Sequence, residues 1–173
     1  PEKKINKDEF INEIIEDFRL MCLSREASLL GRKEVLTGKA KFGIFGDGKE
    51  LAQIAMSKFF RKGDFRSGYY RDQTFMMAIG KLKVSEFFAG LYAHTNISQE
   101  PTSAGRQMGG HFSTKFLKDD GSWLNLTELK NSSSDISPTA AQMPRLVGLG
   151  LASKFFRKNK DLKHLSKFSN HGN

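Results

Sequence analysis

The sequence predicts an α/β protein, rich in helix, that forms part of a parallel-sheet domain and is incomplete at its C-terminus. Several runs of apolar residues recur at helical spacing, and short apolar pieces bounded by turn residues lie between them. With 173 residues, 38% hydrophobic content and 15 Phe, the chain can build one core of its own. We expect one domain over 1–173, in which 1–40 form a leading helix and connection and 41–173 start the α/β unit. The turn-like segment 169–173 lies where a further strand is expected to begin.

Two helices are predicted in the first part of the chain. From Asp8 to about Leu30, acidic side chains lie opposite an apolar face, as in a long amphipathic helix. That face is formed by Phe10, Ile11, Ile14, Ile15, Phe18 and Met21. The glycine-rich segment 43–48 precedes a second helix, whose shared face is formed by Leu51, Ile54, Ala55 and Phe59. Asp47 and Glu50 have the spacing of a capping box at its start.

Short helices and strands and a long loop are predicted in the middle of the chain. Residues 67–70 form an aromatic piece after a turn, which suits a buried strand end. Helical runs follow over 72–80 and 84–94, and 123–126 suit another strand. The intervening residues 96–122 are polar and rich in glycine, and loops of this length are often functional. Because this loop has few apolar anchors, we expect a cofactor and a partner subunit to hold it in place.

A loop and a long helix are predicted after that. Residues 131–135 are typical of a loop. Ser137 as N-cap and Pro138 at the first helical position then open a helix that ends near residue 156, and Pro144 should bend or delay it. The buried face of this helix is expected to consist of Met143, Leu146, Val147, Leu151 and Phe155.

The composition limits the classes of function. The formal charge of +9 suits nucleic acid, acidic lipid or phosphorylated ligands. A nucleic-acid-binding module is one alternative, but the basic residues lie at the ends of apolar runs, as at helix C-termini, and are not interleaved with aromatic residues on strands. No segment has the ~20 apolar residues of a membrane span. The single cysteine, Cys22, suits a core or interface side chain in a reducing compartment, and we expect a soluble cytoplasmic protein.

Tyr70 and Arg71 form the first candidate binding pair. They follow a predicted strand end and precede a helix, which is where open α/β sheets collect ligands. Arginine can bind phosphate through two charge-assisted hydrogen bonds and tyrosine adds a hydroxyl donor, so the pair suits a diphosphate. His111 is the second candidate, because its glycine-rich loop lets a ligand approach closely. An exposed arginine beside a packed tyrosine, and an ordinary loop histidine, are the alternatives.

The sequence contains no convincing magnesium, phosphate or zinc motif. The segment 46–48 (GDG) imitates the start of a magnesium-binding signature, but no Asn lies between Gly48 and Asn96, so a helix-capping turn explains it better. It is not a P-loop either, because no Gly-Lys-Ser/Thr ends it. The histidines have neither the spacing nor the cysteine partners of a zinc site. They are His94, His111, His164 and His171.

Four ordered motifs carry a resemblance to a known family. They are 48–52 (GKELA), 70–72 (YRD), 105–112 (GRQMGGHF) and 136–148 (ISPTAAQMPRLVG). In this order and spacing they resemble the alpha-type subunit of branched-chain 2-oxo acid dehydrogenases, and the resemblance runs from about residue 13 to the end. It implies a thiamine-diphosphate-binding fold, of which 41–173 would be the start of the cofactor-binding unit.

The resemblance also implies an activity and its partners. Such an enzyme oxidatively decarboxylates a branched-chain 2-oxo acid with thiamine diphosphate and magnesium, and transfers the acyl group to the lipoyl group of the acyltransferase core. A pyruvate- or acetoin-type dehydrogenase is the alternative. A beta-type subunit or a fused beta half would complete the active site, within a homo- or hetero-oligomer.

The same resemblance assigns roles to single residues. Tyr70 and Arg71 would hold the diphosphate. Ser137 would lie beside the diphosphate and the substrate, and Tyr70 would also face the substrate. His111 would border the substrate pocket as a catalytic residue.

Several positions depart from the family pattern. Pro138 and Gln142 match positions of a structural potassium site, but Ala141 and Ile136 stand where the family has potassium-site Thr and Ser, which makes that site doubtful. Tyr69 stands where the family has Gln. The magnesium motif lies beyond the four motifs found here, so we expect the 173 residues alone to be inactive.

Overall fold

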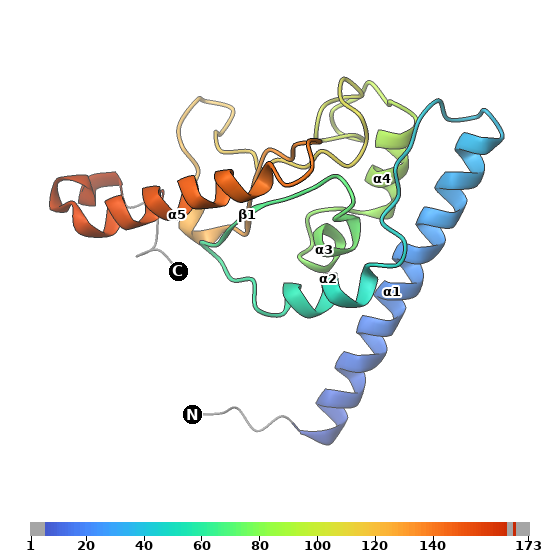
Figure 1. Ribbon diagram of the computed structural model, residues 1–173, viewed down its shortest axis with the longest axis horizontal. Coiled ribbons are helices and arrows are strands. Elements are labelled where there is room, and N and C mark those ends of the chain that lie inside the picture. The colour runs from blue at the N-terminus through green and yellow to red at the C-terminus, as the bar shows by residue number, and fades with distance from the viewer. Residues whose placement is uncertain (1–5, 166–167, 169–173) are drawn as a thin grey trace.

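The computed structural model describes residues 6–165 and residue 168, and in this part of the chain helices surround a small parallel sheet. Figure 1 shows the long first helix on one side, shorter helices next to it, and the last long helix extending away on the opposite side. Helices together with a parallel sheet confirm the α/β class in outline.

The first helix, α1 (Lys7–Leu36), continues past the predicted end at Leu30. Asn6 caps its start, because its side-chain oxygen accepts a hydrogen bond from the backbone N–H of Asp8 at 3.1 Å. The predicted apolar face is not packed: Phe10, Ile11, Ile14, Ile15 and Phe18 are all exposed. Small residues of the second half are buried instead, namely Ser24, Ala27, Ser28 and Gly31. They let the helix approach closely, since a Cβ at Gly31 would lie 2.4 Å from the Phe45 ring.

The second helix, α2 (Glu50–Ser57), follows a glycine-containing turn as predicted, but the predicted capping box does not form. Asp47 pairs with Arg32 at 2.6 Å instead. The Glu50 carboxylate accepts hydrogen bonds from Arg25 Nε at 2.7 Å and Nη2 at 2.9 Å, and from a backbone N–H of the turn at 3.0 Å. The Arg25 hydrogen bond is the largest cause that lowers the pKa of Glu50 to about 2. Glu50 therefore connects α2 to α1.

Helices α3 (Gln73–Ala78) and α4 (Val84–Leu91) surround the apolar core. Its buried members are Phe75, Met76, Ile79, Leu82 and Phe112, and Phe60, Met77 and Phe87 pack against them. Phe112 comes from the long loop over 96–122, which lies next to α4 in Figure 1. The core therefore anchors this loop at the residue beside His111.

A buried polar layer connects α1, α2 and α3. Gln73 Nε2 donates to Ser28 Oγ at 2.7 Å. Gln53 of α2 accepts from the backbone N–H of Phe75 at 2.9 Å and donates to the carbonyl oxygen of Arg71 at 3.1 Å. Buried amides of this kind are costly to leave unpaired, so the layer fixes the start of α3 and the backbone of Arg71, two residues before it.

Strands β1 (Phe65–Ser67) and β2 (Asn131–Ser133) pair in parallel, with Arg66 opposite Ser132. Two predictions are corrected here. The first strand ends at Ser67, so 68–70 leave the sheet, and the second strand forms where a loop was expected.

The second strand consists of polar residues, and hydrogen bonds allow its side chains to be buried. Asn131 Nδ2 donates to the carbonyl oxygens of Leu126 at 2.7 Å and Leu129 at 3.0 Å. The strand predicted over 123–126 is wrong: Trp123 makes only an isolated bridge, and a 3-10 helix, η1 (Leu126–Glu128), follows.

The last long helix, α5 (Gln142–Lys158), begins later than predicted. Ser137 is not its N-cap, and the chain first turns through Ala140, which has a φ of 66°. Pro144 therefore lies at the third helical position, where its missing N–H has no partner in the helix, so it does not break the helix. The face predicted to be buried is exposed over Met143, Leu146, Val147, Leu151 and Phe155. A 3-10 helix, η2 (Lys160–Leu165), follows, and 169–173 lie outside the described residues.

Two further findings bear on the predictions from composition. In the described part of the chain, no helix is long and apolar enough to cross a membrane. Cys22, expected in a core or interface, is exposed on α1.

Candidate anion-binding site

Tyr69, Tyr70 and Arg71 form a compact group in the turn between β1 and α3. The two tyrosine hydroxyls share a hydrogen bond of 2.6 Å, and their ring centroids are 3.9 Å apart. The Arg71 guanidinium lies 5.4 Å from the Tyr69 ring centroid and 5.1 Å from that of Tyr70. The shared hydrogen bond lowers the pKa of Tyr69 and raises that of Tyr70, so the first proton of the pair leaves more easily than the second.

The Arg71 side chain has free donors. Among the described residues it makes no hydrogen bond or ion pair, and its guanidinium only stacks on the two tyrosine rings. A guanidinium carries five N–H donors in a planar fork that matches phosphate and carboxylate oxygens. The stacking holds the group while leaving these donors available to an anion.

His111 lies next to this group and binds Ser137. Its Nδ1 is 3.0 Å from the Met108 carbonyl oxygen, and its Nε2 is 2.7 Å from Ser137 Oγ. A carbonyl oxygen can only accept, so Nδ1 carries a proton, and in the tautomer with that proton alone Nε2 accepts from the Ser137 hydroxyl. The His111 and Tyr70 ring centroids are 5.7 Å apart.

Close backbone approach makes this arrangement possible. A Cβ at Gly110 would lie 2.5 Å from the carbonyl oxygen of Tyr70, and Gly110 has a φ of 87°. Only glycine fits both conditions. Ser137 follows β2, and Thr139 of the same segment forms a hydrogen bond with Tyr69 that lowers its pKa. The fold therefore brings together all four residues proposed for the cofactor and substrate: Tyr70, Arg71, His111 and Ser137.

The loop that carries His111 contains more anchors than its sequence predicts. Glu100 is buried, and its carboxylate accepts from the backbone N–H groups of Thr102, Ser103 and Gly105 at 2.8–3.1 Å. These hydrogen bonds are among the causes that lower the pKa of Glu100 against the opposing effect of burial. The sequence suggested a loop held largely by a cofactor and a partner subunit, and the structure adds two anchors within the chain, Glu100 and the buried Phe112.

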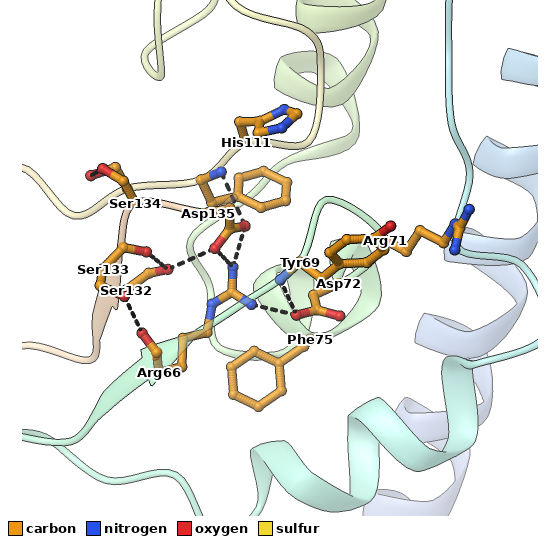
Figure 2. A network of polar contacts seen from close by, with 12 residues as sticks. Arg66, Tyr69, Arg71, Asp72, Phe75, His111, Ser132, Ser133, Ser134 and Asp135 are labelled. Carbon is orange, nitrogen blue, oxygen red and sulfur yellow. Dashed lines mark hydrogen bonds and ion pairs between the residues drawn. The ribbon is translucent and has the colours of Figure 1, made fainter. Parts of the chain in front are cut away.

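An arginine that sequence reasoning missed connects the segments of the site. Arg66, in the middle of β1, places Nη1 2.6 Å from Asp72 and Nη2 2.6 Å from Asp135. Asp72 also accepts from the backbone N–H of Tyr69 at 2.9 Å, and Asp135 from that of Phe112 at 3.2 Å. Figure 2 shows the guanidinium between the two carboxylates, with His111 above and Arg71 to one side. The available signal was weak: a charged residue directly before the strand piece predicted over 67–70.

The residues assigned to potassium are near one another but already bonded. Gln142 Nε2 donates to the carbonyl oxygens of Ile136 at 2.9 Å and Pro138 at 3.4 Å. Such oxygens are what a hard cation would need, and here an amide occupies them, so the arrangement does not fit the ion. Elsewhere in the described residues, His, Cys, Asp and Glu do not gather in groups of three or more that could hold a metal.

A comparison with known proteins agrees with the resemblance of the four motifs. The chain is similar to 2-oxoisovalerate dehydrogenase subunit alpha of Bacillus subtilis (strain 168), with 31% identity over 153 residues. This confirms the resemblance to an alpha-type subunit. The match covers 85% of this chain and 40% of that relative, so the chain spans less than half of the relative's length. No protein-family model matches the chain.

Proposed function

We propose, from this similarity to an alpha-type 2-oxo acid dehydrogenase subunit, that the chain is the front part of a thiamine-diphosphate-dependent enzyme of that kind. One observation carries the proposal. Residues from three distant segments meet at one place and present unused anion donors there, and the segments are those of the family-like motifs.

The donors of this chain suit the diphosphate group of the cofactor. Arg71 would bind it through its free guanidinium N–H groups, and the Tyr70 hydroxyl would add a neutral donor, with Ser137 beside the group. The bound cofactor would supply a nucleophilic carbon and an electron sink for the decarboxylation of a 2-oxo acid. Magnesium would accompany the diphosphate, but we assign it no ligand among the described residues.

His111 would act at the substrate side of the same site. Two hydrogen bonds fix its ring, so with the proton on Nδ1 it can orient the Ser137 hydroxyl and accept a proton at Nε2. A substrate carboxylate near Ser137 would compete with His111 Nε2 for the single proton of that hydroxyl, so its binding would free Nε2 to accept a proton. We propose a branched-chain 2-oxo acid as the substrate, with acyl transfer to the lipoyl group of an acyltransferase.

Exposed apolar surface supports the proposal of a protein partner. The uncovered faces of α1 and α5 carry large apolar side chains, among them Phe10, Phe18, Val147 and Phe155. Soluble proteins rarely leave contiguous surfaces of this kind in water. A beta-type subunit or fused beta half, in an oligomer, would cover such faces and complete the active site.

The experiment is a calorimetric titration of thiamine diphosphate and magnesium into the enzyme assembled with its beta partner. We expect Arg71→Ala to weaken cofactor binding by about 1.5 to 3 kcal/mol, because it removes charge-assisted hydrogen bonds. Arg61→Ala, an exposed arginine outside the site, serves as the matched control and should leave affinity unchanged. Equal affinities for the parent enzyme and Arg71→Ala would remove Arg71 from the cofactor site.

A further inference from the structure

We propose that Arg66 is the positioning residue of this site: its guanidinium sets the distance between the Tyr69–Arg71 turn and the segments that carry His111 and Ser137. The inference rests on the proposed function for the identity of the ligand. The contacts of Arg66 do not depend on that function. None of the four motifs that suggested the family contains Arg66.

One arm of the guanidinium holds the turn. Arg66 Nη1 binds Asp72 Oδ2 at 2.6 Å, and the same oxygen accepts from the backbone N–H of Tyr69 at 2.9 Å. Asp72 is therefore not used to cap α3. It closes the turn that presents Tyr70 and Arg71, and Arg66 fixes where the closed turn lies.

The other arm holds the His111 and Ser137 segments. Arg66 Nη2 binds both Asp135 oxygens, at 2.7 and 2.6 Å. Asp135 accepts from the backbone N–H of Phe112 at 3.2 Å, and its own N–H donates to the Phe112 carbonyl oxygen at 2.9 Å. Phe112 adjoins His111, and Asp135 lies two residues before Ser137. Asp135 thus fixes the segments of His111 and Ser137, whose side chains are 2.7 Å apart.

The surroundings are shaped for an arginine. The side chains of Arg66 and Asp135 are 9% and 0% exposed, so little water competes with their ion pair. The guanidinium carbon lies 5.7 Å from the centroid of the Phe75 ring, and a Cβ at Gly68 would lie 1.7 Å from Nη1. Gly68 therefore leaves the room that the guanidinium fills. A lysine has one compact ammonium and cannot bridge two carboxylates in this planar way.

Burial makes the network sensitive to the loss of one member. Burial raises the pKa of Asp135, and the nearby Arg66 charge opposes this effect. Without the guanidinium, a fully buried carboxylate would have to become protonated or move. Either change would disturb its bond to Phe112, and thereby the ring of His111.

The test uses Arg66→Lys and Asp72→Asn in the 173-residue chain, with two readouts. The first is the ¹⁵N spectrum of the His111 ring without ligand. The parent should show one neutral tautomer with the proton on Nδ1, and Arg66→Lys should show averaging between tautomers. The second is the affinity for inorganic diphosphate, followed by the amide signals of 69–72. Each variant should bind about tenfold more weakly than the parent, as for other supporting residues around a binding site.

Glu50→Gln is the matched control, because it removes the ion pair of another buried carboxylate, far from His111 and Ser137 along the chain. It should lower stability without changing the tautomer or the diphosphate affinity. An Arg66→Lys spectrum identical to that of the parent would overturn the positioning role. Averaging in Arg66→Lys, in a chain whose parent form binds no diphosphate, would support that role and count against the proposed function alone.

Discussion

Replacing Glu50 by Gln should make the chain less stable at neutral pH and less sensitive to acid. The Glu50 side chain is 4% exposed and accepts two hydrogen bonds from Arg25. Its pKa falls from the ordinary value of 4.5 to about 2, which corresponds to at most about 3 kcal/mol. Because 47% of the Arg25 side chain is exposed, solvent screens the pair, and we expect a loss of about 1 to 2 kcal/mol.

The direction of the pH dependence follows from the depressed pKa. In the folded chain the carboxylate holds its charge down to about pH 2, whereas in the unfolded chain it takes up a proton near pH 4.5. The contribution of Glu50 is therefore complete above about pH 5 and is lost as the pH falls from there toward 2. The stability difference between the parent and Glu50→Gln should shrink over the same range.

Urea unfolding at pH 7, 5, 4 and 3, followed by far-ultraviolet circular dichroism, measures this difference directly. Glu16→Gln is the control, since Glu16 pairs with Arg19 on the exposed surface of α1, where such pairs contribute little. Parallel stability profiles for the parent and Glu50→Gln between pH 5 and 3 would refute the reasoning. The buried position of Glu50 would then be a matter of packing alone.

Two further predictions concern the loop that carries His111. Gly110→Ala should lower the free energy of unfolding by about 1 to 3 kcal/mol, because it adds both a clash with the Tyr70 carbonyl and a left-handed φ. Gly121→Ala has the strained φ without the clash and should cost less; equal losses in urea unfolding would rule out the close approach. Glu100→Gln should accelerate tryptic cleavage after Arg106, because its loop N–H groups lose a charged acceptor. Unchanged cleavage in a timed digest would show that Phe112 alone holds the loop.

Local patterns in the sequence were enough for several elements. The helical spacing after Asp8 predicted α1, and the glycine turn before Glu50 predicted the start of α2. The polar, glycine-rich character of 96–122 predicted the loop that carries a site residue. These features depend on neighbours a few residues apart, whose spacing the sequence states directly.

The site residues were named by resemblance, and the fold explains how they meet. By residue type alone, Tyr70, Arg71 and His111 were weak candidates, and Ser137 was expected only as a helix N-cap. Their contacts join residues 41 positions apart (Tyr70 and His111) and 26 positions apart (His111 and Ser137), and close approach at Gly110 and the pairing of β1 with β2 bring them together. Periodicity carries no information on such distant contacts.

By itself, the sequence determined the helices, the turns and the order of the motifs, because these depend on local spacing. Only the tertiary structure decided which polar side chains would be buried and with which partner. Asn131 and Ser132 form a strand, against their preference for loops, because other segments accept from their backbone N–H groups: the Asp64 carbonyl oxygen at 3.0 Å and Thr114 Oγ1 at 2.6 Å. Ser137 leaves its capping position because His111 offers its hydroxyl an acceptor from 26 residues away. Burying a polar group costs free energy unless a hydrogen-bond partner lies beside it, and the fold decides which partner that is.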